Sequence, residues 1–398
     1  MAKQVRKLLV VDRWHIGEHE SWFSDMASDG LHVKKIGKLF AYFEIGDPKE
    51  VRYRIDTSMS RAISEEEKRL YRQAGWEYET KFSEFTLFSS ETKLNAPELH
   101  TDSAEQSHTL KKFDNKIKKS TILVVVLSLL LIGMQFYLWF FLAGPTYSLV
   151  EGGGITYMTT SLLLSGLVYK MIRGIFYVRK LRNHLKEGRP INHHASWRSS
   201  RRVNISLIIA VIPIIAVGVL VPWIQLILDR TENLPQKSSD LPFVRLADIE
   251  QNDSLVREEY FVEENRDILN QYHYHWSPFA PLQYETHESG IISSEVWQDS
   301  SGEYSPYMYT QVYKLTFPSM GENLIKDLMN RYDYRYLGGA LNRQESDDFD
   351  TLFIRETDEE TEVFAAKGKG LIHINYYGYA ELDIILKSVG EKLALIAE

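Results

Sequence analysis

Cysteine is absent from the 398 residues of the chain. This absence excludes a cysteine nucleophile, a thiolate metal site, a disulfide framework and a lipidated N-terminal cysteine. The apolar core of a cleavable signal peptide is also missing near the N-terminus, where the apolar run Leu8–Val11 is too short. We therefore expect the first membrane helix to act as the targeting signal.

Charged residues are missing from three long stretches, Ser120–Ala143, Ile155–Tyr169 and Val203–Leu228. The first and third exceed the roughly 20 apolar residues that cross a hydrocarbon core. An isolated segment in lipid satisfies its backbone hydrogen bonds only as a helix, so we expect spans near residues 120–143 and 203–228. The middle stretch reaches spanning length as a helix near residues 150–172, and a re-entrant segment is the alternative.

Lysine and arginine are missing from Gly144–Gly154, whereas residues 170–202 contain ten of them. Positive charge is retained on the cytoplasmic side of short connections, so three spans place the N-terminus inside and the C-terminus outside. We expect the basic residues to contact anionic lipid headgroups, with docking of a protein in the membrane or cytoplasm as the alternative. The membrane-proximal basic residues are Lys170, Arg173, Arg179, Lys180, Arg182, Arg198, Arg201 and Arg202.

The net charge of −8 is shared unevenly along the chain. Residues 229–398 contain 32 Asp and Glu against 15 Lys and Arg, and this field would repel a nucleic acid. We predict an α+β architecture with folded domains on both sides of the membrane. The expected parts are a cytoplasmic α+β domain at residues 1–90, a polar and basic linker at 91–119, a membrane block at 120–228, a linker at 229–240, and an extracytoplasmic α+β domain at 241–398.

Two similar passes of strand, helix, strand and strand make up the first domain. The first pass begins with a strand at Lys7–Asp12 and ends its helix at Gly30, and the second pass ends its helix at Gly75. Ser64 and Glu67 are spaced as a capping box at the start of the second helix. The copies align at an interval of 45 residues, which predicts an internal repeat.

The last domain shows strand patterns at Phe261–Val262, Tyr272–Trp276, Tyr309–Phe317, Thr351–Arg355, Glu362–Ala366 and Leu371–Tyr376. Helical spacing of apolar residues predicts a helix over Gly321–Tyr332 and a closing helix from Leu382 to Ile396. These alternating elements predict a second α+β domain.

Several short motifs in the first domain resemble a family of bacterial membrane proteins known only as a domain of unknown function. The motifs are Trp22-Phe23, Met26-Ala27, Gly30-Leu31-His32, Tyr53-Arg54-Ile55-Asp56, Gly75-Trp76-Glu77-Tyr78 and Glu98-Leu99-His100-Thr101-Asp102. Genes of this family often lie beside a PadR-type repressor, so the resemblance implies a regulatory setting. It implies no activity, substrate or catalytic residue.

His273 and His275 flank Tyr274, so both imidazoles share one face of a strand. This spacing suits two ligands of Zn²⁺ or Cu²⁺, with His287 or a nearby carboxylate as a third. An aromatic sheet surface with hydrogen-bonded histidines explains the pattern without a metal, and we expect neither metal nor cofactor. The acidic group around Asp347 lacks the glycine of a calcium loop and indicates a solvated strand end.

We find no catalytic constellation and expect a protein that is not an enzyme. The favoured hypothesis is a sensing or regulatory membrane protein that links an external binding domain to a cytoplasmic domain. An accessory subunit of a transporter or envelope complex is the alternative. Pro213 and Pro222 interrupt the hydrogen bonding of the third span and are the expected points of bending.

Overall fold

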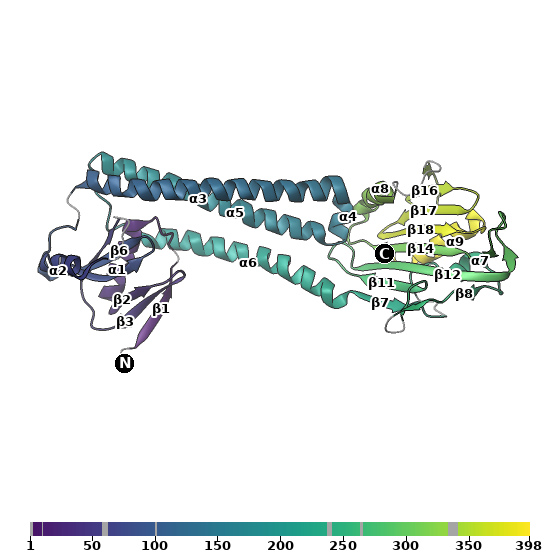
Figure 1. Cartoon of the computed structure of the whole chain (residues 1–398), viewed down its shortest axis with the longest axis horizontal. Helices are drawn as coiled ribbons and strands as arrows, with labels where there is room; N and C mark the ends of the chain where they lie inside the picture. The colour runs from purple at the N-terminus through teal and green to yellow at the C-terminus, as the bar shows by residue number, and fades with distance from the viewer. Residues whose placement is uncertain are drawn as a thin grey trace. The chain divides into compact units, whose positions relative to one another are not determined.

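The computed structural model describes residues 3–9, 11–57, 63–99, 102–236, 241–262, 266–332 and 341–398. Regions of short helices and strands precede and follow three long helices, which confirms the mixed α+β class (Figure 1). The chain divides into two compact units. Unit 1 comprises Met1–Leu131 and Leu162–Ile214, and unit 2 comprises Ile132–Ser161 and Ile215–Glu398.

Among the described residues, three helices are long and apolar enough to cross a membrane. They are α3 (Ser103–Tyr137), continued by the π-helical turn η2 (Leu138–Ala143), then α5 (Gly153–Lys186) and α6 (Trp197–Leu228). All three begin or end beyond the expected spans. Residues 103–119, which fall in the predicted linker 91–119, form the first part of α3, and Leu110, Phe113 and Ile117 of this part lie in the core of unit 1. The middle run is part of a continuous helix that ends before Gly188, where φ is +76°.

Unit 1 contains the predicted repeat. Its first copy is β1 (Gln4–Leu8), α1 (Ile16–Ser28), β2 (Leu31–Ile36) and β3 (Phe40–Ile45), and its second is β4 (Val51–Asp56), α2 (Glu65–Gln73), β5 (Glu77–Phe82) and β6 (Phe85–Glu91). Each copy forms an antiparallel three-stranded sheet in the same strand order, β1-β3-β2 and β4-β6-β5. The register also shifts at equivalent places, between Val33 and Lys35 and between Tyr78 and Thr80.

Local signals in the repeat place most of its elements correctly. The capping box of Ser64 and Glu67 is formed, and Gly30 and Gly75 have positive φ at the two helix ends. A Cβ on Gly30 would lie 2.7 Å from the carbonyl oxygen of Gly46, so the first turn requires glycine. The first strand begins earlier than predicted, since β1 spans Gln4–Leu8 and overlaps the predicted strand Lys7–Asp12 only at Lys7 and Leu8. Val10 lies outside the described residues.

The core of unit 1 combines the repeat with the membrane helices. Trp22, Phe23 and Phe43 are buried together with Phe113 of α3 and Val178 of α5. The core of unit 1 therefore extends beyond residue 90, the predicted end of the first domain. After the 3₁₀ turn η1 (Thr92–Leu94), the chain supplies a further wall of the same core from α3.

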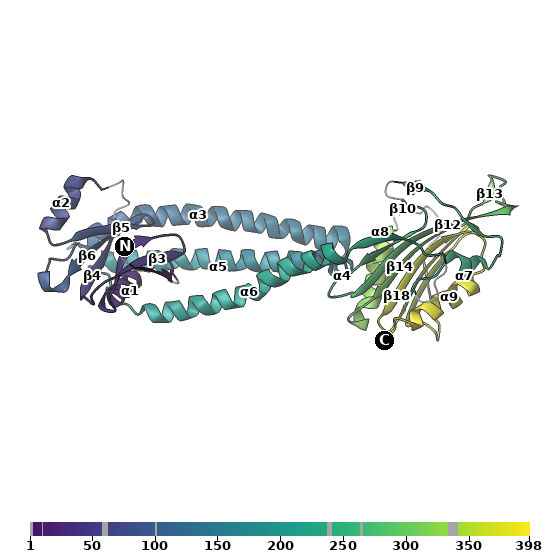
Figure 2. The same ribbon diagram turned by 90° about the horizontal axis from the view of Figure 1, so that it is seen from below.

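Unit 2 is built on a ten-stranded antiparallel sheet, whose curvature is visible in Figure 2. Its main path runs in the order β15-β16-β17-β18-β14-β12-β11-β7, with β13 and β8 paired to β12. The strands are β7 (Arg230–Asn233), β8 (Val256–Arg257), β11 (Gln271–His275), β12 (Leu282–Val296), β13 (Glu303–Tyr304), β14 (Tyr307–Lys314), β15 (Asn342–Gln344), β16 (Thr351–Glu356), β17 (Glu360–Lys367) and β18 (Gly370–Tyr377). The two short strands β9 (Phe261–Val262) and β10 (Arg266–Asp267) pair separately.

Helices pack on both faces of this sheet. On one face, α7 (Leu246–Glu250) and α9 (Leu382–Ala394) share a core with Ile372 and Ile374. On the other face, α8 (Gly321–Tyr332) packs Leu324 and Leu328 against Phe364, and Val150 of α4 (Pro145–Val150) joins this cluster. The 3₁₀ turn η4 (Pro318–Met320) precedes α8.

The expected second domain is confirmed as an α+β fold, with corrections at its start. The helix α8 has the predicted bounds, and β17 and β18 form the predicted hairpin. The long strand β12 was missed because it mixes polar and apolar residues on both faces. Residues 230–233 of the expected linker 229–240 form β7, while 237–240 lie outside the described residues.

Candidate functional site

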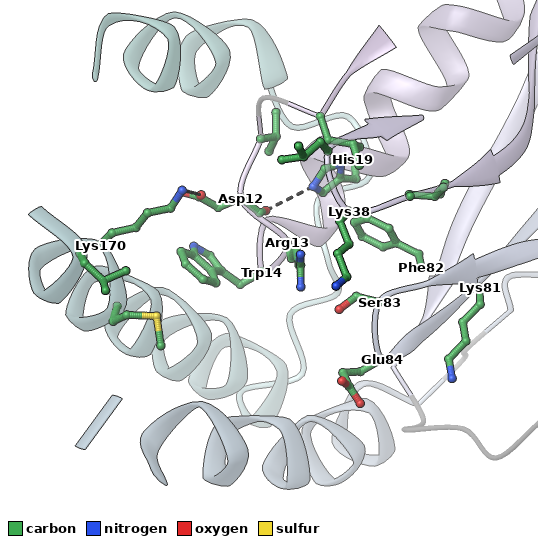
Figure 3. A pocket seen from close by; sticks show the side chains of 17 residues that line it. Asp12, Arg13, Trp14, His19, Lys38, Lys81, Phe82, Ser83, Glu84 and Lys170 are labelled. Carbon is green, nitrogen blue, oxygen red and sulfur yellow. Dashed lines mark hydrogen bonds and ion pairs between the residues drawn. The ribbon is translucent and has the colours of Figure 1, made fainter. Parts of the chain in front are cut away.

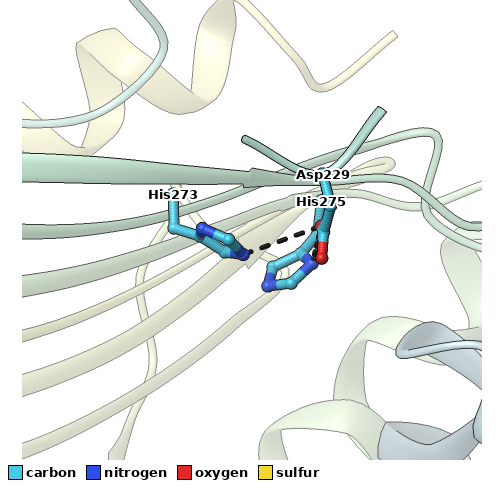
Figure 4. A group of neighbouring side chains, drawn as sticks. All are labelled: Asp229, His273 and His275. Atoms are coloured by element: carbon cyan, nitrogen blue, oxygen red, sulfur yellow. Dashed lines mark ion pairs between the residues drawn. The ribbon is translucent and has the colours of Figure 1, made fainter. Parts of the chain in front are cut away.

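The third membrane helix ends beside the two histidines that the sequence singled out. The helix α6 stops at Leu228, and Asp229 connects it directly to β7. Since β7 pairs with β11, with Thr231 opposite His273, the hydrogen-bonded ladder brings Asp229 to the same edge as His273 and His275. Figure 4 shows these three side chains converging.

The three side chains form a compact group of possible metal ligands. One ligand atom from each of Asp229, His273 and His275 lies within 4.8 Å of the others. The distance from His273 Nε2 to Asp229 Oδ1 is 3.6 Å, and His275 Nδ1 forms a closer ion-pair contact with the same oxygen. The two imidazole rings meet edge to face, with centroids 3.9 Å apart.

Further polar residues surround this group. The Thr231 hydroxyl lies 2.6 Å from His273 Nδ1. Glu285 is the direct cross-strand neighbour of His273 on β12, and His287 Nε2 lies 3.7 Å from the Glu285 carboxylate. Together with Gln271, these residues line a cavity of about 200 Å³. The third residue proposed from sequence, His287, lies at this cavity, whereas the carboxylate nearest both histidines is Asp229.

The protonation of the site reflects burial and an excess of carboxylates. Burial, followed by the neighbouring His273, lowers the pKa of His275 and favours its neutral form. The hydrogen bond with His287 is the largest influence on Glu285, whose pKa is lowered. The pKa of Glu151 is raised to about 7, chiefly by burial and then by the negative charges of Glu285 and Asp229, against the opposing effect of Arg331.

The loop before the second membrane helix is tied to the sheet of unit 2. The Asp327 carboxylate on α8 accepts hydrogen bonds from the backbone N–H groups of Thr146 (2.7 Å) and Tyr147 (2.9 Å) at the start of α4. The Gln283 amide donates to the carbonyl oxygen of Val150 at 2.9 Å. Both ends of α4 are therefore held by the extramembrane fold.

A second polar cluster in unit 2 is buried. Arg355 and Glu362 form an ion pair, and the His373 ring lies 2.9 Å from Glu362 and 3.1 Å from the Gln311 amide oxygen. The same ring stacks on Phe364 at 4.0 Å between centroids. Burial lowers the pKa of His373 despite the hydrogen bond to Glu362. Because these groups satisfy one another across neighbouring strands, we assign the cluster to sheet stability.

Unit 1 contains a larger cavity of about 720 Å³, shown in Figure 3. The buried His19 lies at its wall with Nε2 3.2 Å from the carbonyl oxygen of Asp12, and burial lowers the pKa of His19 to about 4. Lys170 forms an ion pair with Asp12 at 2.9 Å. Cations and carboxylates both line the cavity, so its charge does not select one class of ligand. The charged lining residues are Asp12, Arg13, Lys38, Lys81, Glu84 and Lys170.

The basic stretch after the second span holds the N-terminal repeat. Arg182 contacts the buried Asp114 carboxylate, and the Trp197 indole donates a hydrogen bond to Asp25 at 2.8 Å. Arg198 and Arg201 lie over the Trp197 ring at 5.4 and 5.6 Å. The sequence treated these charges as a lipid or partner surface. Within the chain, Arg182 pairs with α3, and Arg198 lies 3.7 Å from the Asp25 carboxylate of α1. Arg173 is half-buried, and Arg179, Lys180 and Arg202 are exposed.

The third span continues through both of its prolines. Pro213 and Pro222 lie inside the uninterrupted helix α6. Between them, a Cβ on Gly218 would lie 2.9 Å from the Thr159 hydroxyl oxygen and 3.3 Å from Thr159 Cβ on α5. Gly218 therefore permits close packing of α5 and α6 within unit 2.

The motifs that carry the family resemblance have structural roles in unit 1. Arg54 donates two hydrogen bonds of 2.8 Å to the Glu98 carboxylate, and the Trp76 indole donates to the carbonyl oxygen of Pro97 at 2.9 Å. These contacts fasten the segment after β6 onto the second repeat. His100 and Thr101 of the last motif lie outside the described residues.

These features define a mixed α+β protein whose described part contains three helices long and apolar enough to cross a membrane. Residues 15–124 match the family described as "Protein of unknown function (DUF2812)". The matched region covers most of the repeat and the first part of α3. No curated protein and no solved structure matches the chain.

Proposed function

We propose that the chain is a membrane-anchored regulatory protein in which α6 couples the folded part of unit 2 to that of unit 1. The observation that carries this proposal is the attachment of α6 at both ends. In unit 1, the Trp197 indole and the Ser200 hydroxyl at its start donate to Asp25 and Glu18 of α1. In unit 2, its last residue Leu228 is followed by Asp229 and the paired strand β7.

Two features of α6 support movement at this helix. Pro213 and Pro222 each remove one backbone hydrogen bond, which lowers the resistance of a helix to bending. Gly218 has no side chain that could interlock with α5. The helix α6 can therefore slide or rotate against Thr159 of α5 without first moving such a side chain out of the way. A displacement of β7 would therefore act on α6 first and reach α1 through Trp197.

Orientation follows from the basic residues that unit 1 leaves exposed. Arg179, Lys180 and Arg202 are available to anionic headgroups, at about 1 kcal/mol for each charge near the surface. This supports a cytoplasmic N-terminal domain and an extracytoplasmic C-terminal domain in a cell membrane. We propose that one domain receives the signal on one side of the membrane and the other domain passes it on at the opposite side. The protein would then act by binding and not by catalysis.

A reversible lock between α5 and α6 tests the coupling. The Cβ positions of residues 159 and 218 are 3.3 Å apart, close to the separation of a disulfide, and the chain contains no other cysteine. We expect the double variant Thr159→Cys/Gly218→Cys to complement a deletion when reduced and to lose the response when oxidised. The two single variants, treated identically, control for oxidation itself. Full complementation by the oxidised, crosslinked protein would refute the coupling role of α6.

A further inference from the structure

We propose that Asp229, His273 and His275 bind a divalent transition-metal ion of the zinc and copper class. The ion would join the end of α6 to the strand β11, which lies next to the edge strand β7. The binding site is inferred from the side-chain geometry. The regulatory consequence of binding rests on the function proposed above.

The separations fit a small ion with short bonds. Metal–nitrogen and metal–oxygen bonds of about 2.0–2.2 Å in a tetrahedral site place neighbouring ligand atoms roughly 3.4 Å apart. The 3.6 Å between His273 Nε2 and Asp229 Oδ1 is close to this value. The contact between His275 Nδ1 and Asp229 is shorter, so the carboxylate would turn from a hydrogen-bond acceptor into a shared ligand.

A second contact orients one of the ligands. The Thr231 hydroxyl accepts the Nδ1–H of His273 in the tautomer that leaves Nε2 free for a metal, at a distance of 2.6 Å. Thr231 is held in place because it pairs with His273 in the β7–β11 ladder. The histidine is therefore positioned by the sheet backbone as well as by its own side-chain rotamer.

The ligand set selects the class of ion. Two imidazoles and one carboxylate suit zinc, copper, nickel or cobalt, whereas calcium requires six or more oxygen ligands. The three side chains remain about one-third exposed, between 31% and 37%, which leaves space for water in a fourth position. Glu285 faces His273 across the ladder and lines the adjoining cavity, so it is the protein group best placed to bind or orient that water.

Coordination would strengthen a link that the fold already makes through the β7 backbone and through the ion pairs of Asp229 with the two histidines. Asp229 directly follows the last residue of α6, while His273 and His275 belong to β11. An ion held by all three would resist displacement of the helix end from β11. Metal occupancy would thereby change how motion in unit 2 acts on α6.

Titration of the metal-free, full-length protein in detergent with Zn²⁺ and with Co²⁺ tests the site. We expect one ion per chain, micromolar or tighter affinity, and cobalt absorption bands of a four- or five-coordinate nitrogen and oxygen site. The double variant His273→Gln/His275→Gln and the single variant Asp229→Asn should each weaken binding at least 100-fold. His194→Ala, which removes an exposed histidine from unit 1, should bind normally.

Equal affinity in the cluster variants and the parent protein would overturn the metal site, as would millimolar binding with the spectrum of octahedral aqueous cobalt. Circular dichroism of each variant shows whether a loss of binding reflects misfolding. The disulfide lock separates this proposal from the coupling proposal. If the metal binds but the oxidised lock leaves the response intact, the site remains and the coupling function fails.

Discussion

At the scale of single residues, Glu151 is a carboxyl group whose pKa is raised above its ordinary value. It lies just after α4, outside the membrane helices, and its pKa is raised to about 7 by burial, with further contributions from Glu285 and Asp229. The native state therefore keeps this proton to a higher pH than the unfolded chain, where the value is 4.5. Stability is lost as the pH rises between these values, because the unfolded state then binds fewer protons.

The variant Glu151→Gln should remove this pH dependence, since the amide resembles the protonated acid. We expect no stabilisation near pH 4 and a gain at pH 8 that cannot exceed about 3 kcal/mol. Thermal unfolding of the full-length protein in detergent at both pH values measures the difference. A gain of the same size at pH 4 and pH 8 would show that the charge of Glu151 is not its cause.

The buried ion pair between Arg355 and Glu362 provides a second residue-scale prediction. Glu362→Ala leaves the Arg355 guanidinium buried without this carboxylate and should cost about 3–5 kcal/mol. Replacing both residues, as Arg355→Met/Glu362→Leu, should cost less than the single change because no charge remains buried. Denaturant unfolding measures both, with the exposed Glu356→Gln as control. Equal losses in single and double variants would contradict the electrostatic explanation.

At the scale of elements, α6 differs from the other two membrane helices in containing prolines within its span. Pro213 and Pro222 lower the bending resistance of a helix whose two ends are attached to different folded regions. Helical insertion does not need these prolines, because alanine restores two backbone hydrogen bonds. Their expected contribution is to movement, not to abundance.

The double variant Pro213→Ala/Pro222→Ala should reach the membrane at the parent level and alter the response that deletion of the gene alters. Quantitative blotting of membranes and complementation of a deletion measure the two properties. The matched control Pro145→Ala changes a proline at the first turn of α4, outside the bending helix. Complete complementation under every condition that reveals a phenotype would contradict a mechanical role for the prolines.

At the scale of the whole molecule, the central prediction is the side of the membrane on which each domain lies. Single cysteines can be introduced without background, because the chain has none. Exposed serines serve in both regions, Ser196 before α6 and Ser301 between β12 and β14. We expect a membrane-impermeant thiol reagent added to intact cells to label Ser301→Cys alone, and to label Ser196→Cys only after permeabilisation. Labelling of Ser196→Cys in intact cells would overturn the proposed orientation.

Local sequence patterns were sufficient to predict those elements that are formed by interactions between residues close together in the chain. Uncharged runs indicated three membrane helices, and the interval of 45 residues indicated a repeat whose copies share one strand order. The capping box at Ser64 and the helix Gly321–Tyr332 were predictable because capping and helical periodicity involve residues only a few positions apart.

Non-local pairing decided the rest. The sequence indicated His273 and His275 but could not identify Asp229 as their neighbour, because only the β7–β11 ladder brings residues 229 and 273 together. It likewise could not show that Arg182 pairs with α3 or that Trp197 docks α1, since their partners Asp114 and Asp25 lie far away along the chain. Hydrophobic periodicity determines which face of an element is buried, but the partner on that face is determined by how the whole chain packs.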